Sequence, residues 1–204
     1  MKKEQKKNKL FIVLAVSLLA VAFFVVAILF FLPKDKTSGS NGEYYPANYD
    51  ENIFLNHAYM EFQRDLLYSV GGVEQLFSYE EDLESADTEC EFFLKYFHTV
   101  ISGDYESYKS FFVDGYFEEE PKFTMQMIYD PYVRYHSISK DKIDGKEVSL
   151  LNFQVSYRIF KNNKTFRSDV DSNVEVPQIY QLIQGEDGSY RIFRILNIEV
   201  ENAD

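Results

Sequence analysis

Residues 151–159 read Leu-Asn-Phe-Gln-Val-Ser-Tyr-Arg-Ile, and this stretch decides the fold class of the chain. Every second side chain in it is apolar or aromatic, and the side chains between them are polar. Successive side chains of a β-strand point to opposite faces of its sheet. The alternation therefore predicts a strand with one buried face and one solvent-facing face.

Turn signals around this strand predict further strands on both sides of it. Asp144-Gly145, Asn162-Asn163 and Asp187-Gly188 each suit the positive φ angles of a tight hairpin. A proline removes one ladder hydrogen bond, so the strand that contains Pro177 is expected at an edge or with a bulge. We expect antiparallel neighbours near residues 132–143, 147–160, 174–183 and 189–200.

Helical periodicity dominates the chain before residue 132. Apolar side chains at helical spacing predict a helix within 51–70, which Gly71-Gly72 would end. Thr88 and Glu91 fit a capping box, and Gly103 suits the end of the helix that follows it. Shorter helices are expected after Asp104 and over 123–128. Helices followed by a meander of strands predict an α+β domain.

The N-terminal region has the composition of a membrane anchor. Residues 10–32 carry no charge and one polar side chain, Ser17, and a helix of this length spans the roughly 30 Å of a hydrocarbon core. A cleaved signal peptide would end in small residues, which are missing here. Lysines crowd residues 1–9, so the N-terminus is expected in the cytoplasm.

These features predict a single-pass protein with a signal-anchor. Its parts are a cytoplasmic basic tail (1–9), a transmembrane helix (10–32), a flexible linker (33–50) and an extracytoplasmic α+β domain (51–204). The expected location is the cell membrane, with the C-terminal domain outside the cell. The composition is typical of a bacterial surface protein.

Charge and cysteine content narrow the function classes. The net charge of −12 repels nucleic acid, so we expect no nucleic-acid partner. The single cysteine, Cys90, excludes an intramolecular disulfide framework and is expected to be a small buried residue.

The order of elements resembles the nuclear-transport-factor-2-like superfamily, a cone of helices wrapped on a curved antiparallel sheet. The residues that carry the resemblance are the helix of 90–101, Gly103-Asp104, the stretch 108–112 and the closing segment 188–195. It covers about 85–200. It implies helices packed on a curved antiparallel sheet. Together with the anchor, the expected fold class is α+β, with a single N-terminal transmembrane helix followed by helices packed on a curved antiparallel sheet.

Enzymes of that superfamily, such as ketosteroid isomerases and small dehydratases, place an Asp or His base and Tyr donors in the cone. The resemblance makes His98, His136, Tyr96, Tyr135 and Asp104 the side chains that could meet there. No fixed spacing joins them, and the 16 tyrosines of the chain make chance proximity easy. The sequence therefore predicts no catalytic residue.

A second pattern resembles a metal loop. Asp169, Asp171, Asn173 and Glu175 alternate like the start of a calcium-binding loop, but Val174 stands where the turn needs glycine. A polar bend between strands is the preferred interpretation. Asn163-Lys164-Thr165 is a formal glycosylation sequon, which matters only in a host that glycosylates. We predict no metal site and no cofactor.

The function predicted first is a non-enzymatic, membrane-anchored binding or scaffold domain. Its architecture is analogous to scaffold components of bacterial envelope or secretion-type assemblies, which implies a protein partner or self-association outside the cytoplasm. The alternative is a small-ligand-binding or enzymatic cone of the isomerase or dehydratase kind. A further possibility is a cell-envelope stress or wall-associated protein. An open, lined pocket would favour the small-ligand alternative.

Overall fold

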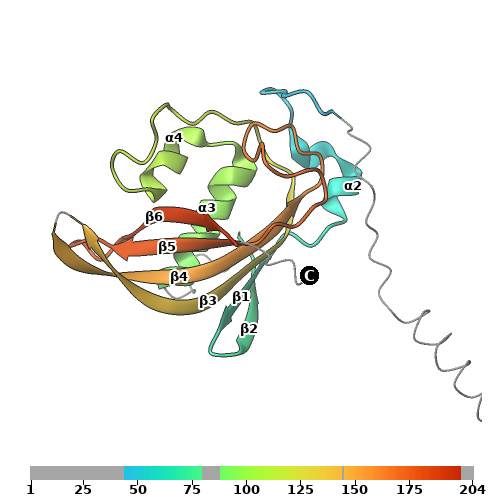
Figure 1. The fold of residues 1–204 in the computed structure, drawn as a ribbon. Helices are drawn as coiled ribbons and strands as arrows, with labels where there is room; N and C mark the ends of the chain where they lie inside the picture. The colour runs from blue at the N-terminus through green and yellow to red at the C-terminus, as the bar shows by residue number, and fades with distance from the viewer. Residues whose placement is uncertain (1–43, 80–87, 144, 199–204) are drawn as a thin grey trace, which may run out of the picture. The chain divides into compact units, whose positions relative to one another are not determined.

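The computed structural model describes residues 44–79, 88–143 and 145–198, and within them one sheet forms the framework (Figure 1). The six strands have the order β2-β1-β3-β4-β5-β6. Their bounds are β1 Leu66–Val70, β2 Val73–Phe77, β3 Ile128–Ile143, β4 Lys146–Ile159, β5 Gln178–Gln184 and β6 Tyr190–Asn197.

The meander predicted from the sequence is confirmed for β3 to β6. Each of these strands pairs antiparallel with the next. Gly145 and Gly188 have positive φ angles in the two tight turns, as expected. Pro177 immediately precedes β5 and so costs that strand no ladder bond. The prediction of a tight turn at Asn162-Asn163 is wrong, because these residues open the long loop 160–177 between β4 and β5.

The helix predicted before Gly103 is confirmed as α3, Thr88–Ser102. Gly103 ends it with a φ of +70°, and the Gly103 N–H donates to the Val100 carbonyl at 3.2 Å. The short helix expected after Asp104 is α4, Tyr105–Tyr108, which continues into the 3-10 helix η2, Lys109–Phe111.

The core lies between α3 and one face of the sheet. Phe93 on α3 meets the ring of Phe153 edge-on at 5.1 Å, and Phe97 meets Tyr157 at 5.5 Å. Phe153 and Tyr157 belong to the alternating stretch of β4, so the buried face is the one that the sequence predicted. Cys90 is buried in α3, also as predicted.

The sheet curves strongly around this core (Figure 1). Two register shifts interrupt the pairing of β3 with β4, one between Tyr129 and Tyr132 and one between Tyr135 and Ser137. An irregularity of this kind adds a residue to one strand and bends it. The bends in β3 therefore make the sheet concave on the face that α3 and α4 cover.

Two predicted helices are wrong. Within 51–70 the structure has the 3-10 helix η1 (Ile53–Leu55), the single turn α2 (His57–Met60) and then β1. Gly71 and Gly72, expected to end a helix, instead form the turn between β1 and β2. Residues 123–127 form no helix, and β3 begins at Ile128.

The predicted fold class needs correction as well. Strands dominate the described residues, and α3 is the only long helix among them, so a set of helices packed on an antiparallel sheet does not describe this fold. The sheet is also mixed rather than antiparallel, because β1 runs parallel to β3. The physical cause is the stretch 66–77, which adds two strands beyond β3 instead of a helix above the sheet.

The transmembrane helix in the predicted fold class is not supported either. Within residues 44–79, 88–143 and 145–198, no helix is both long enough and apolar enough to cross a bilayer. The segment 10–32, to which the membrane and signal-anchor predictions refer, lies outside the described residues. The location outside the cytoplasm rests on the same segment and stays a prediction, as do the domain boundaries.

Candidate functional site

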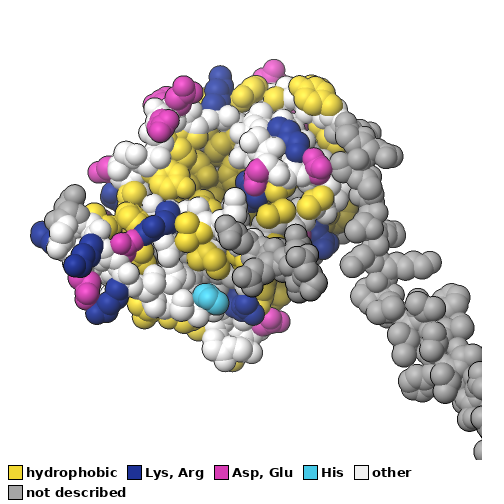
Figure 2. All heavy atoms as spheres, viewed as in Figure 1, with side chains coloured by type: hydrophobic (Ala, Val, Ile, Leu, Met, Phe, Trp, Pro, Cys, Tyr) yellow, Lys and Arg dark blue, Asp and Glu magenta, His cyan; other side chains and the backbone are white. Residues whose placement is uncertain are grey.

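A hollow of the domain lies between the α3–α4 pair and the bent sheet. We call it the tyrosine pocket, and its volume is about 440 Å³. Figure 2 shows a depression lined by hydrophobic side chains in the region between α4 and β6. Its wall is formed by Tyr96, Tyr108, Phe112, Tyr116, Phe117, Tyr157, Phe166, Arg167, Ser168, Asp169, Gln178, Tyr180, Ile195 and Asn197.

Four tyrosine side chains lie together in the pocket wall, and the hydroxyls of three of them are connected. The Tyr96 hydroxyl lies 3.1 Å from that of Tyr180 and 3.5 Å from that of Tyr108. Tyr157 lies in the same wall, and its hydroxyl accepts a hydrogen bond from Arg167. The four side chains come from α3, α4, β4 and β5, so the cluster ties the helices to the sheet.

Counting hydrogens in this cluster shows what it offers to a bound molecule. The hydroxyls of Tyr96, Tyr108 and Tyr180 each carry one hydrogen, and the two contacts between them use two. At least one of the three hydrogens is therefore not used inside the cluster. A buried donor gains free energy when it meets an acceptor, so this hydrogen favours an acceptor oxygen in the pocket.

Burial keeps these tyrosines in their neutral form. It is the main cause that raises the pKa of Tyr96 and of Tyr180 well above the ordinary value, and it also raises the pKa of Tyr157. At neutral pH the hydroxyls therefore act as hydrogen-bond donors and acceptors, and none of them acts as a base.

Arg167 lies at the polar side of the same pocket, buried apart from about 10% of its side chain. Its Nε and Nη2 donate to the two carboxylate oxygens of Asp169, both at 2.7 Å. Its Nη1 donates to the Tyr157 hydroxyl at 3.2 Å and to Gln178 Oε1 at 2.7 Å. Four of the five guanidinium N–H groups are thus engaged by the protein.

Aromatic rings close the remaining wall. Tyr108 contacts the rings of Phe112, Phe117 and Phe166 at centroid distances of 4.9, 5.9 and 5.9 Å. Such walls bind flat or apolar rings through dispersion and edge-to-face contacts. The pocket therefore combines an apolar surface with one cluster of hydroxyls and one ion pair, in which the arginine is buried and the carboxylate is about half exposed.

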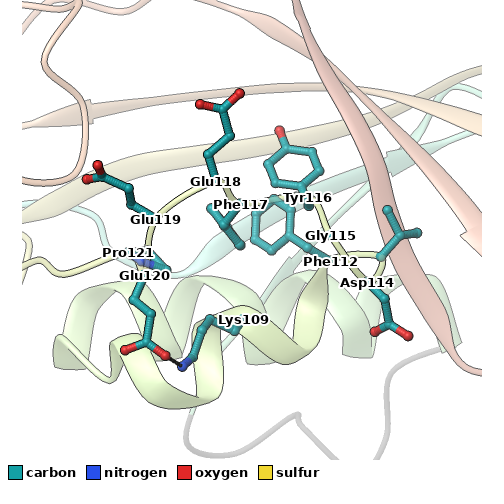
Figure 3. Close-up of a pocket in the computed structure, with 11 residues that line it drawn as sticks. Lys109, Phe112, Asp114, Gly115, Tyr116, Phe117, Glu118, Glu119, Glu120 and Pro121 are labelled. Atoms are coloured by element: carbon teal, nitrogen blue, oxygen red, sulfur yellow. Dashed lines mark hydrogen bonds and ion pairs between the residues drawn. The ribbon is translucent and has the colours of Figure 1, made fainter.

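A second, smaller hollow lies beside the loop 112–121 and shares Phe112, Tyr116 and Phe117 with the tyrosine pocket (Figure 3). Glu118, Glu119 and Glu120 belong to the lining of the smaller hollow, and Glu120 accepts a hydrogen bond from Lys109 at 3.0 Å. The loop thus forms a common wall of both hollows, and its acidic residues are not in the lining of the tyrosine pocket.

The structure brings one of the five sequence-derived site residues into the pocket. Tyr96 lies in its wall, whereas His98 and His136 are exposed on α3 and β3. Tyr135 packs on Phe153 at 5.6 Å, away from the pocket lining. Asp104 caps α4, where hydrogen bonds from Ser107 lower the pKa of its carboxyl, so it is not tuned as a base.

The four acidic and amide side chains of the calcium-like pattern point to different partners. Asp169 pairs with Arg167, Asp171 with Lys164 at 2.9 Å, and Glu175 with Arg158 at 3.3 Å. Asn173 accepts a hydrogen bond from the Tyr129 hydroxyl at 3.0 Å. Among the described residues no group of three or more His, Cys, Asp or Glu side chains is placed to hold a metal ion.

The sequence reasoning missed Arg167, Gln178 and the loop aromatic Phe166. Arg167 and Asp169 are two positions apart in an irregular loop, where no periodicity marks a pair. One sequence feature could have indicated the pair: Arg167 stands between an aromatic residue and two acidic residues, in a chain with more acidic than basic residues.

Comparison with known proteins identifies no relative. No protein-family model, no curated protein and no solved structure matches this chain. The resemblance to the nuclear-transport-factor-2-like superfamily therefore stays a prediction, and the function has to be argued from the pocket itself.

Proposed function

We propose that this domain binds a small ring-bearing molecule in the tyrosine pocket. The observation that carries the proposal is the convergence of four tyrosine side chains, three of them with connected hydroxyls, on one aromatic-lined hollow of about 440 Å³. This volume is within the range of about 300–1,000 Å³ that is typical of small-molecule sites. An apolar ring would contact Phe112, Phe117 and Phe166, and an acceptor oxygen would reach the hydroxyl cluster.

Binding, rather than catalysis, is the role that the lining supports. A general base must lie within reach of its substrate and needs a pKa near the working pH. Both histidines put forward from the sequence lie outside the pocket lining. Within the part of the chain that the structure describes, the one carboxylate in the lining is that of Asp169, and Arg167 holds it. The tyrosines are neutral donors. These features support a binding domain over an isomerase or dehydratase.

The test uses the full-length protein and two probes that share one ring, 2-naphthamide and 2-naphthoate. Ligand-observed saturation-transfer NMR reports whether either probe binds. Ile195→Trp adds an indole to the pocket wall and should abolish binding, whereas Ile138→Trp, at a position that is 61% exposed on β3, should not. If neither probe binds, or if Ile195→Trp leaves binding unchanged, the proposal is wrong.

The protein-partner function predicted from the sequence has one supporting observation of its own. β2 pairs with β1 along one edge and stands at the end of the strand order. It exposes Val73 by 64% and Leu76 by 50%, and its one charged side chain is that of Glu74, without a lysine, proline or bulge. Self-association through this edge would add a strand to the sheet.

Sedimentation of the full-length chain tests this second candidate. Gln75→Pro removes a backbone donor from β2, and Leu76→Lys adds a charge to the exposed strand. Both changes should lower the apparent mass if copies pair through β2. A mass that is monomeric in the wild type removes the candidate.

A further inference from the structure

We propose that the tyrosine pocket selects uncharged ligands and that Asp169 is the residue that sets this selectivity. The inference rests on the proposed function, because it names the chemical class of the ligand at the same site.

The first step is the charge inventory of the pocket. Among the described residues of its lining, Arg167 and Asp169 are the two charged side chains, and they form a bidentate ion pair with both distances at 2.7 Å. Bidentate arginine–carboxylate pairs are among the strongest hydrogen-bonded pairs in proteins. The lining therefore has no net charge, although it contains a buried cation.

The second step concerns the hydrogen bonds that the Arg167 guanidinium already makes. Its Nη1 hydrogens are engaged by Tyr157 and Gln178, which fix the plane of the group from the sheet side. An anion could gain full charge pairing only by displacing the Asp169 carboxylate. If it bound beside that carboxylate instead, two like charges would lie together in a partly desolvated site, which is unfavourable.

The third step is that Asp169 stays in place and ionised. Its side chain is about half exposed, so water continues to solvate the carboxylate that Arg167 holds. The hydrogen bonds from Arg167 also lower the pKa of Asp169. Near neutral pH the site thus presents a neutral pair to the ligand, and the tyrosine hydroxyls supply uncharged donors. An uncharged head group with an acceptor oxygen fits this surface.

The experiment compares the affinities of 2-naphthamide and 2-naphthoate for the full-length wild type, Asp169→Asn and Asp171→Asn. Titration calorimetry or competition NMR gives each dissociation constant. The two variants change the same charge in the same loop, but Asp171 pairs with Lys164 outside the pocket lining. Asp171→Asn thus controls for the overall acidity of the chain, and circular dichroism checks that each variant is folded.

In the wild type and in Asp171→Asn we expect the amide to bind at least about tenfold more tightly than the carboxylate, which corresponds to about 1.4 kcal/mol. Asp169→Asn should abolish or reverse this preference, because the guanidinium then lacks its counter-ion. A wild type that prefers the carboxylate overturns the inference but leaves the proposed function standing. A preference that persists in folded Asp169→Asn also overturns it. If neither probe binds the wild type, the proposed function itself fails.

Discussion

Arg167 and Asp169 face each other across two hydrogen bonds of 2.7 Å at the polar side of the tyrosine pocket. The pair joins an irregular loop to the sheet, because Arg167 also donates to Tyr157 on β4 and Gln178 on β5. Other contacts hold the loop 160–177 as well: Asn162 Nδ2 donates to the carbonyls of Arg167 and Val170, both at 2.8 Å, and Asn163 Nδ2 donates to the Thr124 hydroxyl at 2.6 Å. The ion pair is therefore both a structural tie and part of the site.

The first prediction concerns pH. Hydrogen bonds from Arg167 lower the pKa of Asp169 in the folded protein. The stability from this pair is complete above the unfolded pKa of about 3.9 and is lost as the pH falls toward the lowered folded value. The free energy of unfolding in urea should therefore fall less between pH 7 and pH 3 in Asp169→Asn than in the wild type. An identical fall in both proteins would show that the pair contributes no acid sensitivity.

The second prediction concerns the hydroxyl cluster. Tyr96 lies at its centre, so Tyr96→Phe removes two hydrogen-bond contacts and leaves the ring in place. We expect a loss of about 0.5–1.5 kcal/mol in unfolding free energy. Tyr44→Phe, at a residue that is 78% exposed, should change stability by less than about 0.5 kcal/mol. Equal effects at the two positions would contradict the cluster as described.

The third prediction concerns the end of α3. A Cβ at Gly103 would lie 2.6 Å from Met125 N and 2.9 Å from Thr124 C, and the φ of +70° already disfavours a side chain. Gly103→Ala should therefore cost about 2–4 kcal/mol, the sum of backbone strain and a steric clash. Gly145 has a similar φ of +79° but no atom within 4 Å.

The matched control is therefore Gly145→Ala, which should cost only the backbone strain of about 1–2 kcal/mol. Chemical denaturation of both variants measures the difference. If Gly145→Ala is the more damaging of the two, the packing of α3 against residues 124–125 is wrong.

The fourth prediction separates binding from catalysis. His98 and His136 are exposed and lie outside the pocket lining. The double variant His98→Ala/His136→Ala should therefore bind 2-naphthamide as the wild type does and should keep the cellular phenotype. A folded double variant without function would instead favour the enzymatic alternative.

The sequence predicts an element of this fold correctly where the local hydrophobic pattern favours the same secondary structure as the packing against distant residues. In β4 they agree: Phe153 and Tyr157 alternate with polar residues and face α3. In 51–70 they conflict. Leu66 fits a helical period with Tyr59 and Phe62, yet Leu66 and Tyr68 also share one face of a strand, and pairing with β3 decides the outcome. β1 pairs in parallel with residues of β3 that lie more than 60 positions later in the chain, and such a distant pairing leaves no pattern in the local sequence.

The site was predictable only where it lies on a regular element. Tyr96 is on α3, and the resemblance put it among the five side chains that could meet in the cone. Arg167 and Asp169 belong to a loop whose path is set by the contacts described above, and the same acidic residue suggested a calcium-like pattern instead. Their pairing depends on long-range packing that a sequence pattern does not encode.

The measurement that tests the ligand pocket most directly is NMR of the full-length protein with carbon-13-labelled tyrosine rings, assigned by single Tyr→Phe variants and titrated with 2-naphthamide. The account predicts that the ring signals of Tyr96, Tyr108, Tyr157 and Tyr180 shift together with one dissociation constant, while that of Tyr44 stays in place. Shifts confined to exposed tyrosines, or no shift of the four pocket signals at saturating probe, would contradict it.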